Sequence, residues 1–391
     1  MQKNNSDRQY NGKIVIITGE LSGEIHASHL VEALQTSLDA QFSGMGSTRL
    51  QETGVRIIVD YKDISITGLS EVLWKLKYIR RAYDTLRDHI RRERPALLIL
   101  VDFPGFNLKI AKFAKVLGVP VVYFIPPQIW AWRKSRIKKI RERVDRVICV
   151  LPFEKALYDK NGVDSIYVGH PFMNTVKPLY SREEFIGKLG IDKKGPMITI
   201  MPGSRENEVR KHMPTLLAVI GSLERRIGKL TVLLPLAENI DFRLVEDYVS
   251  GRPSVQTFKG LSYDALAASD LALVASGSAT LEAAILGVPT IVIYKISSLS
   301  YLLARMLVKV DHISLPNIIA AKEVFPEFVQ HLNPEDIAEK AAYMLNNGRE
   351  SVKADIEVIK RRLGGFDSYK MAKDEITGYL EHLYGTLSKA P

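Results

Sequence analysis

Short, continuous apolar runs alternate with helix-length segments along almost the whole chain, and this alternation limits the folds open to it. The runs lie at residues 13–18, 96–101, 119–125, 144–150, 197–201, 230–235, 254–258, 271–275 and 290–294. A strand that is apolar on both faces is typical of a parallel sheet covered by helices on each side. The pattern therefore predicts an α/β protein with parallel sheets.

The chain has 391 residues, which is more than a single hydrophobic core usually serves. A strand, a tight loop and a helix are expected at 14–34 and again at 198–217, which predicts two Rossmann-like domains. Residues 169–188 lack strand character and contain Pro171 and Pro178, so we place the domain boundary near Pro178. The predicted domains are 1–178 and 179–365, with a last helical segment at 366–391. Ligands of such sheets bind beyond the carboxyl ends of the strands, so the expected active site is a cleft between the domains.

The single cysteine, Cys149, excludes an intramolecular disulfide. No apolar run reaches the roughly 18 residues that span a bilayer, and no export signal is recognisable, so we expect a cytoplasmic protein. The net charge of +10 is concentrated in residues 74–94 and 133–146, which carry +5 and +6. This concentration indicates an anionic partner, which is a nucleic acid, an anionic membrane surface or a phosphorylated substrate. The alternative is two solvated helix faces.

Three loops between a strand and a helix contain the small residues that allow tight turns. The first, Gly19-Glu20-Leu21-Ser22-Gly23-Glu24, does not have the spacing of a dinucleotide-binding fingerprint. The other two are expected to bind phosphate or ribose, and the candidate residues are Gly203, Ser204, Arg205, Gly277, Ser278 and Glu282. A loop with an arginine and a loop with a glutamate in one domain match the two ends of a nucleoside diphosphate. Helix capping and favourable placement in the helix dipole are the structural alternatives.

Asp102 follows the strand at 96–101 and precedes Phe103, Pro104 and Gly105. A carboxylate at the carboxyl end of a central strand faces the ligand side of the sheet, where it can act as a general base. The alternative is an Asx turn, which an aspartate before a Pro–Gly pair also favours.

The segment 66–90 has helical periodicity, with a core stripe that contains Ile79, Leu86 and Ile90. Four further apolar residues lie off this stripe, near basic ones, and form a candidate membrane-facing patch of Ile66, Leu69, Leu73 and Trp74. Burial of this patch against a neighbouring loop is the alternative.

Eight short strings occur in the order found in lipid-A-disaccharide synthases, and the chain resembles that family over about residues 13–345. The strings are GELSGE at 19–24, VDFPGFN at 101–107, IWAWR at 129–133, LPFE at 151–154, VGHP at 168–171, MPGSR at 201–205, ASGSATLE at 275–282 and SLPN at 314–317. The resemblance implies an inverting GT-B glycosyltransferase whose C-terminal helix crosses back to the first domain. Its reaction moves diacylglucosamine from a UDP carrier to the primary hydroxyl of diacylglucosamine anomeric phosphate, and it releases UDP and lipid A disaccharide phosphate.

The resemblance also implies roles for individual residues. The catalytic residues of the family are matched by Asp102, Glu20 and Ser22. Its UDP-binding residues are matched by Arg205 and Glu282, and the asparagine of its SLPN string is matched by Asn317. Family members often have other residues where this chain has Glu24, Gly105 and Gln128, so no role is assigned to these three.

The implied partners are the acylated UDP-sugar, the acylated sugar phosphate acceptor and the anionic cytoplasmic face of the inner membrane. No cofactor is expected, and metal independence is favoured because no Asp-x-Asp stands on a strand-end loop.

Three other functions compete with this reading. The nearest is a related GT-B UDP-GlcNAc transferase or epimerase that acts on another substrate. A nucleic-acid-binding protein is disfavoured because no recognised binding module accompanies the basic segments. A scaffold without activity is disfavoured because Asp102 and Arg205 are both present.

Overall fold

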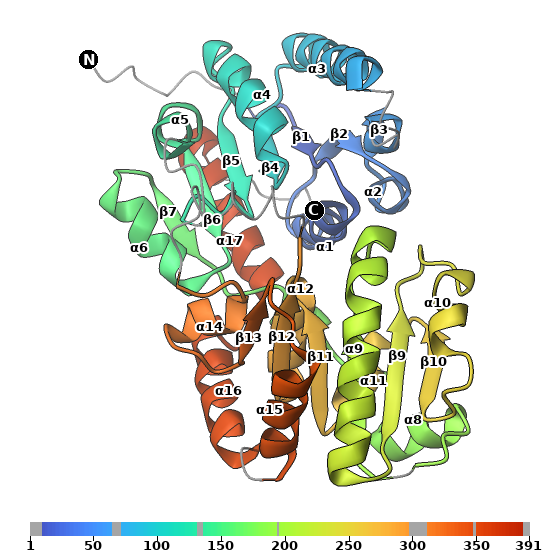
Figure 1. The fold of residues 1–391 in the computed structure, drawn as a ribbon. Coiled ribbons are helices and arrows are strands. Elements are labelled where there is room, and N and C mark those ends of the chain that lie inside the picture. The colour runs from blue at the N-terminus through green and yellow to red at the C-terminus, as the bar shows by residue number, and fades with distance from the viewer. Residues whose placement is uncertain are drawn as a thin grey trace. The chain divides into compact units, whose positions relative to one another are not determined.

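The computed structural model describes residues 10–64, 72–130, 136–193, 195–296, 311–346 and 349–385 (Figure 1). Its contacts divide the chain into two compact units, one of residues 1–171 with 366–391 and the other of residues 172–365. The division between the first and second units thus falls after Pro171, whereas the composition of the linker favours Pro178. Each unit is a parallel sheet with helices on both faces, which confirms the predicted α/β class.

The first unit contains a seven-stranded parallel sheet in the order β3-β2-β1-β4-β5-β6-β7. Its strands are β1 (Lys13–Ile17), β2 (Gln41–Gly46), β3 (Arg56–Asp60), β4 (Leu97–Val101), β5 (Val121–Phe124), β6 (Arg146–Cys149) and β7 (Ser165–Tyr167). Its helices are α1 (Leu21–Gln35), α2 (Thr48–Glu52), α3 (Val72–Glu93), α4 (Pro104–Val116), α5 (Arg136–Arg143), α6 (Pro152–Lys160) and α17 (Ser368–Tyr384), with a 3₁₀ turn, η1, at Tyr61–Ile64.

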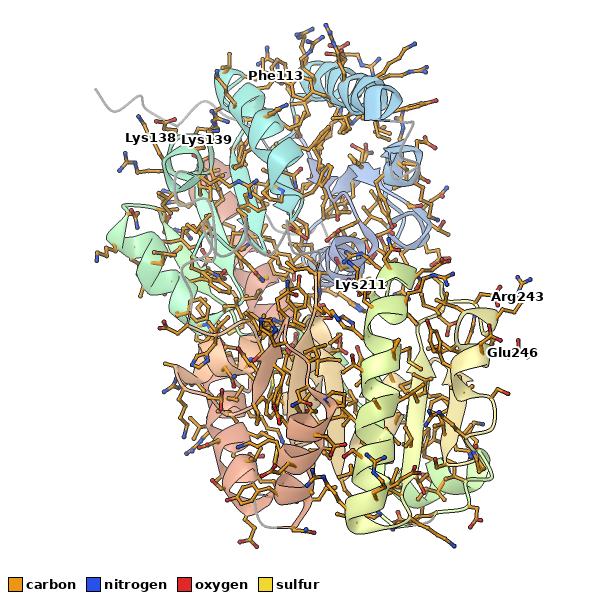
Figure 2. The ribbon with its side chains drawn as sticks, in the orientation of Figure 1. Phe113, Lys138, Lys139, Lys211, Arg243 and Glu246 are labelled. Atoms are coloured by element: carbon orange, nitrogen blue, oxygen red, sulfur yellow. The ribbon has the colours of Figure 1, made fainter. Side chains whose placement is uncertain are left out.

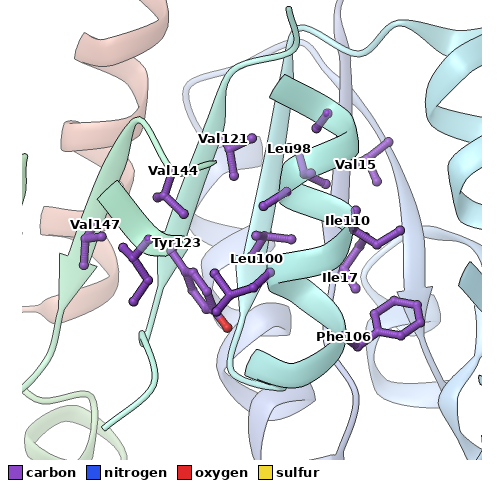
Figure 3. Packing of buried hydrophobic residues seen from close by; sticks show 14 of the residues in the cluster. Val15, Ile17, Leu98, Leu100, Phe106, Ile110, Val121, Tyr123, Val144 and Val147 are labelled. Carbon is purple, nitrogen blue, oxygen red and sulfur yellow. The ribbon is translucent and has the colours of Figure 1, made fainter. Parts of the chain in front are cut away.

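Alternate residues of the central strands of this unit enter two different cores, because successive side chains of a strand point to opposite faces. Leu98 and Leu100 of β4 pack with α3, α4 and α5, as Figure 3 shows for part of this cluster. Leu97 and Ile99 pack instead with α1 and α17 on the other face. The last helix of the chain therefore completes a core that the first strands begin.

The second unit contains a six-stranded parallel sheet in the order β10-β9-β8-β11-β12-β13. Its strands are β8 (Met197–Met201), β9 (Thr231–Leu236), β10 (Val255–Lys259), β11 (Leu271–Ala275), β12 (Thr290–Tyr294) and β13 (Glu327–Val329). Its helices are α7 (Phe172–Thr175), α8 (Arg182–Lys188), α9 (Glu206–Ile227), α10 (Arg243–Val249), α11 (Ser262–Ala268), α12 (Ser278–Ile285), α14 (Leu315–Ala320), α15 (Pro334–Asn346) and α16 (Arg349–Leu363). Helices α9 and α15 cover one face together, and α8 and α11 cover part of the other.

The expected core stripe of α3 is confirmed at the positions that the structure describes. Leu86 and Ile90 are fully buried, and Ile79 packs against the same cluster from the side. The membrane-facing patch cannot be placed in the same way, since Ile66 and Leu69 and the side chains of Leu73 and Trp74 lie outside the described residues. No helix among the described residues is both long and apolar enough to cross a membrane.

Candidate active site

Both sheets reverse their direction of growth at one point, and the predicted loops lie there. In the first unit the reversal falls between β1 and β4, and in the second between β8 and β11. Ligands of such sheets bind where the strand order reverses, beyond the carboxyl ends of the two central strands. The loop that contains Glu20 follows β1, and Asp102 follows β4. Arg205 follows β8, and Gly277 follows β11.

The turn at Asp102 has an unusual backbone. Asp102 and Phe103 adopt φ angles of 46° and 45°, in the left-handed region that residues other than glycine rarely occupy. The Asp102 carbonyl oxygen accepts hydrogen bonds from Asn107 Nδ2 at 2.7 Å and from the Tyr123 hydroxyl at 2.6 Å. These two bonds hold the strained turn, and such strain is often found where a side chain is oriented for function.

Two glycines of the first loop are required by close packing, Gly19 against this turn and Gly23 against the start of the loop itself. A Cβ on Gly19 would lie 2.3 Å from the Phe103 ring, and one on Gly23 would lie 2.4 Å from Thr18 Oγ1. A larger residue at position 19 would push the loop away from the Asp102 turn, and one at position 23 would displace the Thr18 side chain. The loop sequence therefore keeps the residues between β1 and α1 in contact with the end of β4.

This contact brings two carboxyl groups together. Asp102 is partly buried, and burial together with a hydrogen bond and the charge of Glu20 raises the pKa of Asp102 to about 7. The Ser22 hydroxyl donates to Glu20 Oε1 at 2.9 Å and so orients the second carboxyl. With this pKa, Asp102 exchanges a proton near neutral pH. The three catalytic candidates of the sequence thus form one cluster that can accept a proton from a hydroxyl group.

Glu24 is not part of that cluster. It is buried, and its Oε1 accepts hydrogen bonds from the backbone N–H groups of Ser47 at 2.7 Å and Leu50 at 3.0 Å. Its Oε2 accepts a third from the Tyr61 hydroxyl at 2.6 Å. The carboxylate therefore caps α2 from outside the helix, which is a structural role.

In the second unit, the loop between β8 and α9 already binds a carboxylate. Glu208 Oε2 accepts the backbone N–H groups of Ser204 at 3.1 Å and Arg205 at 3.3 Å, and Arg205 Nη1 contacts Glu208 Oε1 at 3.0 Å. Gly203 has φ 127°, and a Cβ there would lie 2.5 Å from Glu208 Oε2. Two N–H donors at a helix start and a guanidinium are also the groups that bind a phosphate. The Arg205 side chain is 79% exposed, so it can leave Glu208 for another anion.

His212 was missed by the sequence analysis, although it supports this loop. Its ring is buried, Nδ1 donates to the Pro202 carbonyl at 2.6 Å, and Nε2 accepts the Lys295 N–H at 3.2 Å. The two contacts select one neutral tautomer, and burial lowers the pKa of the ring. His212 follows Arg205 by seven residues, which is two helical turns and therefore the same helix face. This spacing is the sequence signal that could have identified His212.

The loop between β11 and α12 places Glu282 in a partly buried position. Burial raises its pKa to about 7, and a hydrogen bond from Ser278 partly offsets the rise. Gly277 has an extended backbone, and a Cβ there would have no described atom within 4 Å. Neither the backbone nor the packing of the described residues explains a glycine at this position. Close approach of a ligand to the chain is a further reason for one.

The Asn317 side chain is fully engaged inside the protein. Its Nδ2 donates to the Phe325 carbonyl at 2.7 Å and to Glu327 Oε1 at 2.8 Å, and its Oδ1 accepts the N–H groups of Val324 and Phe325 at 2.8 Å. It is 0% exposed. Any effect of Asn317 on a ligand therefore acts through the loop that it holds. In the part of the chain that the structure describes, no three His, Cys, Asp or Glu side chains gather where they could hold a metal ion.

A likeness to solved structures extends over the whole chain. The crystal structure of a putative UDP-N-acetylglucosamine 2-epimerase from Listeria monocytogenes superposes with a TM-score of 0.65 and covers 97% of this chain and 100% of its own. The two sequences are 13% identical, so this likeness concerns the fold alone. It agrees with the predicted architecture of two Rossmann-like domains.

Sequence comparison is more specific. A lipid-A-disaccharide synthase of Syntrophus aciditrophicus is 41% identical over 361 residues, which cover 90% of this chain and 94% of that protein. A protein of the same name from Solibacter usitatus is 38% identical over 357 residues, which cover 90% and 93%. The sequence profile of the lipid-A-disaccharide synthetase family matches residues 14–375. With this match over nearly its whole length, the chain belongs to the lipid-A-disaccharide synthetase family.

Proposed function

We propose that this chain transfers diacylglucosamine from UDP-diacylglucosamine to the primary hydroxyl of diacylglucosamine anomeric phosphate, forming lipid A disaccharide phosphate and UDP. Family membership supports the type of reaction, and the observation that carries the mechanism is the carboxyl pair of Glu20 and Asp102 at a strand-order reversal.

Asp102 is the general base of this proposal. Its carboxylate takes the proton of the primary hydroxyl while the hydroxyl oxygen attacks the anomeric carbon of the donor sugar. The new oxygen–carbon bond forms on the face opposite the leaving group, so the configuration inverts. A base whose pKa lies close to the working pH is well suited to this step, because it is ionised in a useful fraction and remains basic. Glu20 keeps the pKa of Asp102 in this range, and the Ser22 hydroxyl orients Glu20.

The leaving group is the UDP diphosphate, on which negative charge grows as its bond to the anomeric carbon breaks. We propose that the loop of Gly203, Ser204 and Arg205 stabilises this charge. The hydrogen-bond donors of this loop hold the Glu208 carboxylate in the present structure. Donors oriented in advance toward a developing charge are among the largest contributions to catalysis. Gly277 and Ser278 approach the same ligand, Glu282 accepts from the ribose hydroxyls, and Asn317 holds its loop in place.

Both proposed substrates are acylated, so the enzyme must reach a membrane surface. We propose that the protein binds peripherally to the cytoplasmic face of the inner membrane through Ile66, Leu69, Leu73 and Trp74, with nearby cations adding electrostatic attraction. The exposed Arg80 and Arg81 of α3 support this. Further cations lie on α5, where Lys138 and Lys139 extend away from the helix (Figure 2).

The direct test is to incubate the purified protein with the acylated UDP donor and the acylated acceptor phosphate and to measure UDP and disaccharide together. The proposal expects equal amounts of both products and no UDP without the acceptor. Equal rates with a donor that lacks acyl chains would instead favour a transferase or epimerase for another substrate.

A further inference from the structure

A buried carboxyl group of the first unit has no part in the chemistry proposed above. Glu154 lies in the first turn of α6 and is only 2% exposed. Its Oε1 accepts a hydrogen bond from Trp130 Nε1 at 3.1 Å, and its Oε2 accepts the Leu151 N–H at 3.3 Å. One carboxyl therefore joins the start of α6 to a tryptophan that precedes it by 24 positions.

Trp130 ends a segment, residues 125–130, that begins beside Asp102. The Asp102 N–H donates to the Ile125 carbonyl at 3.3 Å, so the segment is bonded to the backbone of the proposed base. Ile125 has φ 54°, a strained conformation for a β-branched residue. Within the segment Gln128 is the exposed side chain, while its neighbours are buried or partly buried.

Helix α6 contacts the other end of this segment at three places. Besides the bond from Glu154, the Tyr158 hydroxyl donates to the Pro127 carbonyl at 3.4 Å. The rings of Trp130 and Phe153 meet edge to face, with centroids 5.1 Å apart and planes at 88°. The 125–130 segment is thus held between the Asp102 turn and α6.

Helix capping accounts for a glutamate at this position but not for its burial. Glu154 is the N3 residue of a capping box and accepts the N-cap N–H of Leu151, a role that glutamate fills equally well at the surface, where its charge stays hydrated. Burial here is costly for a charged group, since it raises the pKa of Glu154 to about 8 even though the Trp130 and backbone hydrogen bonds lower it. Burial gives this carboxyl group one hydrogen-bond partner that an ordinary capping residue lacks, which is the Trp130 indole N–H.

We propose that Glu154 is a positioning residue for the transfer reaction, which by holding Trp130 fixes the 125–130 segment as the wall of the acceptor site beside Asp102. The inference rests on the proposed function. In this arrangement the acceptor sugar lies against the exposed Gln128. Loss of the Glu154–Trp130 contact should therefore weaken use of the acceptor and leave UDP binding by the second unit unchanged.

The test uses the full chain with Glu154→Leu, which removes the acceptor of the Trp130 N–H, with Trp130→Phe and with both together, and Glu142→Leu on the exposed face of α5 is the control. Each single variant at the contact should raise the KM for the acceptor and lower kcat/KM about tenfold, because small misplacements near the reacting atoms are costly. The double variant should lose no more than either single one, as expected for two residues that act through one contact. The KM for the UDP donor should remain constant, and Glu142→Leu should match the wild type.

A general loss of folded protein would lower kcat with both KM values unchanged, and that pattern would overturn the proposal, as would additive losses in the double variant. Tryptophan fluorescence separates the contact from the activity. Glu154→Leu should shift the part of the emission that Trp130→Phe removes, whether or not the protein transfers diacylglucosamine. An unshifted emission would refute the contact, whereas a shifted emission without any wild-type transfer would refute the proposed function.

Discussion

Replacement of Glu20 by glutamine isolates the contribution of the second carboxyl to the proposed base. Glutamine keeps the length of the side chain and an oxygen that can accept the Ser22 hydroxyl, but it carries no charge. Burial is the largest cause of the raised pKa of Asp102, and the hydrogen bond and charge of Glu20 follow. The substitution removes the effect of the charge and leaves the burial. We therefore expect the pKa of Asp102 to fall from about 7 while remaining above its ordinary value of 3.8.

The size of the effect follows from the removal of one neighbouring like charge, for which a fall of about one pH unit is reasonable. The base works when ionised, so activity rises as the pH rises through its pKa. A lower pKa moves this acid limb to lower pH. At pH 6 the ionised fraction of Asp102 would increase from roughly a tenth to about one half. At high pH the maximal rate should fall by about threefold, because the weaker base removes the proton less readily.

The assay is kcat/KM for UDP release, measured by chromatography between about pH 5 and pH 9 so that no coupling enzyme limits the range. Glu32→Gln is the matched control, because Glu32 is an exposed glutamate of α1, the helix that Glu20 precedes, and contacts only His29 of that helix, at 3.2 Å, among the ion pairs of the described residues. Its acid limb should coincide with that of the wild type. An acid limb of Glu20→Gln that stays in place or moves to higher pH would refute the view that Glu20 controls the protonation of the base.

Four further outcomes are expected. Asp102→Asn should lower turnover at least about a hundredfold with an unchanged melting temperature, and near-normal turnover would remove Asp102 from catalysis. Arg205→Ala should raise the Kd of UDP in calorimetry, and an unchanged Kd would exclude the β8–α9 loop from the diphosphate site. Activity should survive excess EDTA, and a loss that magnesium restores would contradict a metal-free reaction. Serine at Leu69, Leu73 and Trp74 together should reduce cosedimentation with anionic liposomes while the melting curve stays unchanged, whereas unfolding would assign these residues to the core.

The central elements of both units could be predicted because their signals are local. Apolar strands such as β4 and β11, and the small residues after β11, can be recognised in the sequence without knowing which strands they pair with. The missed strands are β2, β3, β7 and β13. Strands β7 and β13 have only three residues each. Strand β2 contains Gly44, which weakens the strand pattern but is required because a Cβ there would lie 1.9 Å from the Ile16 carbonyl oxygen.

The chemistry of the candidate site was harder to predict because it depends on pairing between distant segments. Glu20 and Asp102 are neighbours only because β1 and β4 pair in one sheet. The contact of Glu208 with Arg205 depends on the exact start of α9, which a sequence pattern locates poorly. Asn317 has the composition of a ligand-binding residue, and only the fold reveals that its four hydrogen bonds are internal.

The return of α17 to the first unit determines the order in which the protein can mature on the ribosome. Tyr369, Ala372, Ile376 and Leu380 complete the core that contains Leu97 and Ile99. Residues 172–365 are translated between these two parts of the core, which takes roughly 10 to 40 s at ordinary rates of synthesis. During that time the sheet face that α17 covers in the folded protein is covered by α1 alone. The second unit has its complete sequence at residue 365, before α17 is translated. The first unit to be synthesised is therefore the last to finish folding, and a chaperone has its longest opportunity to bind at that face.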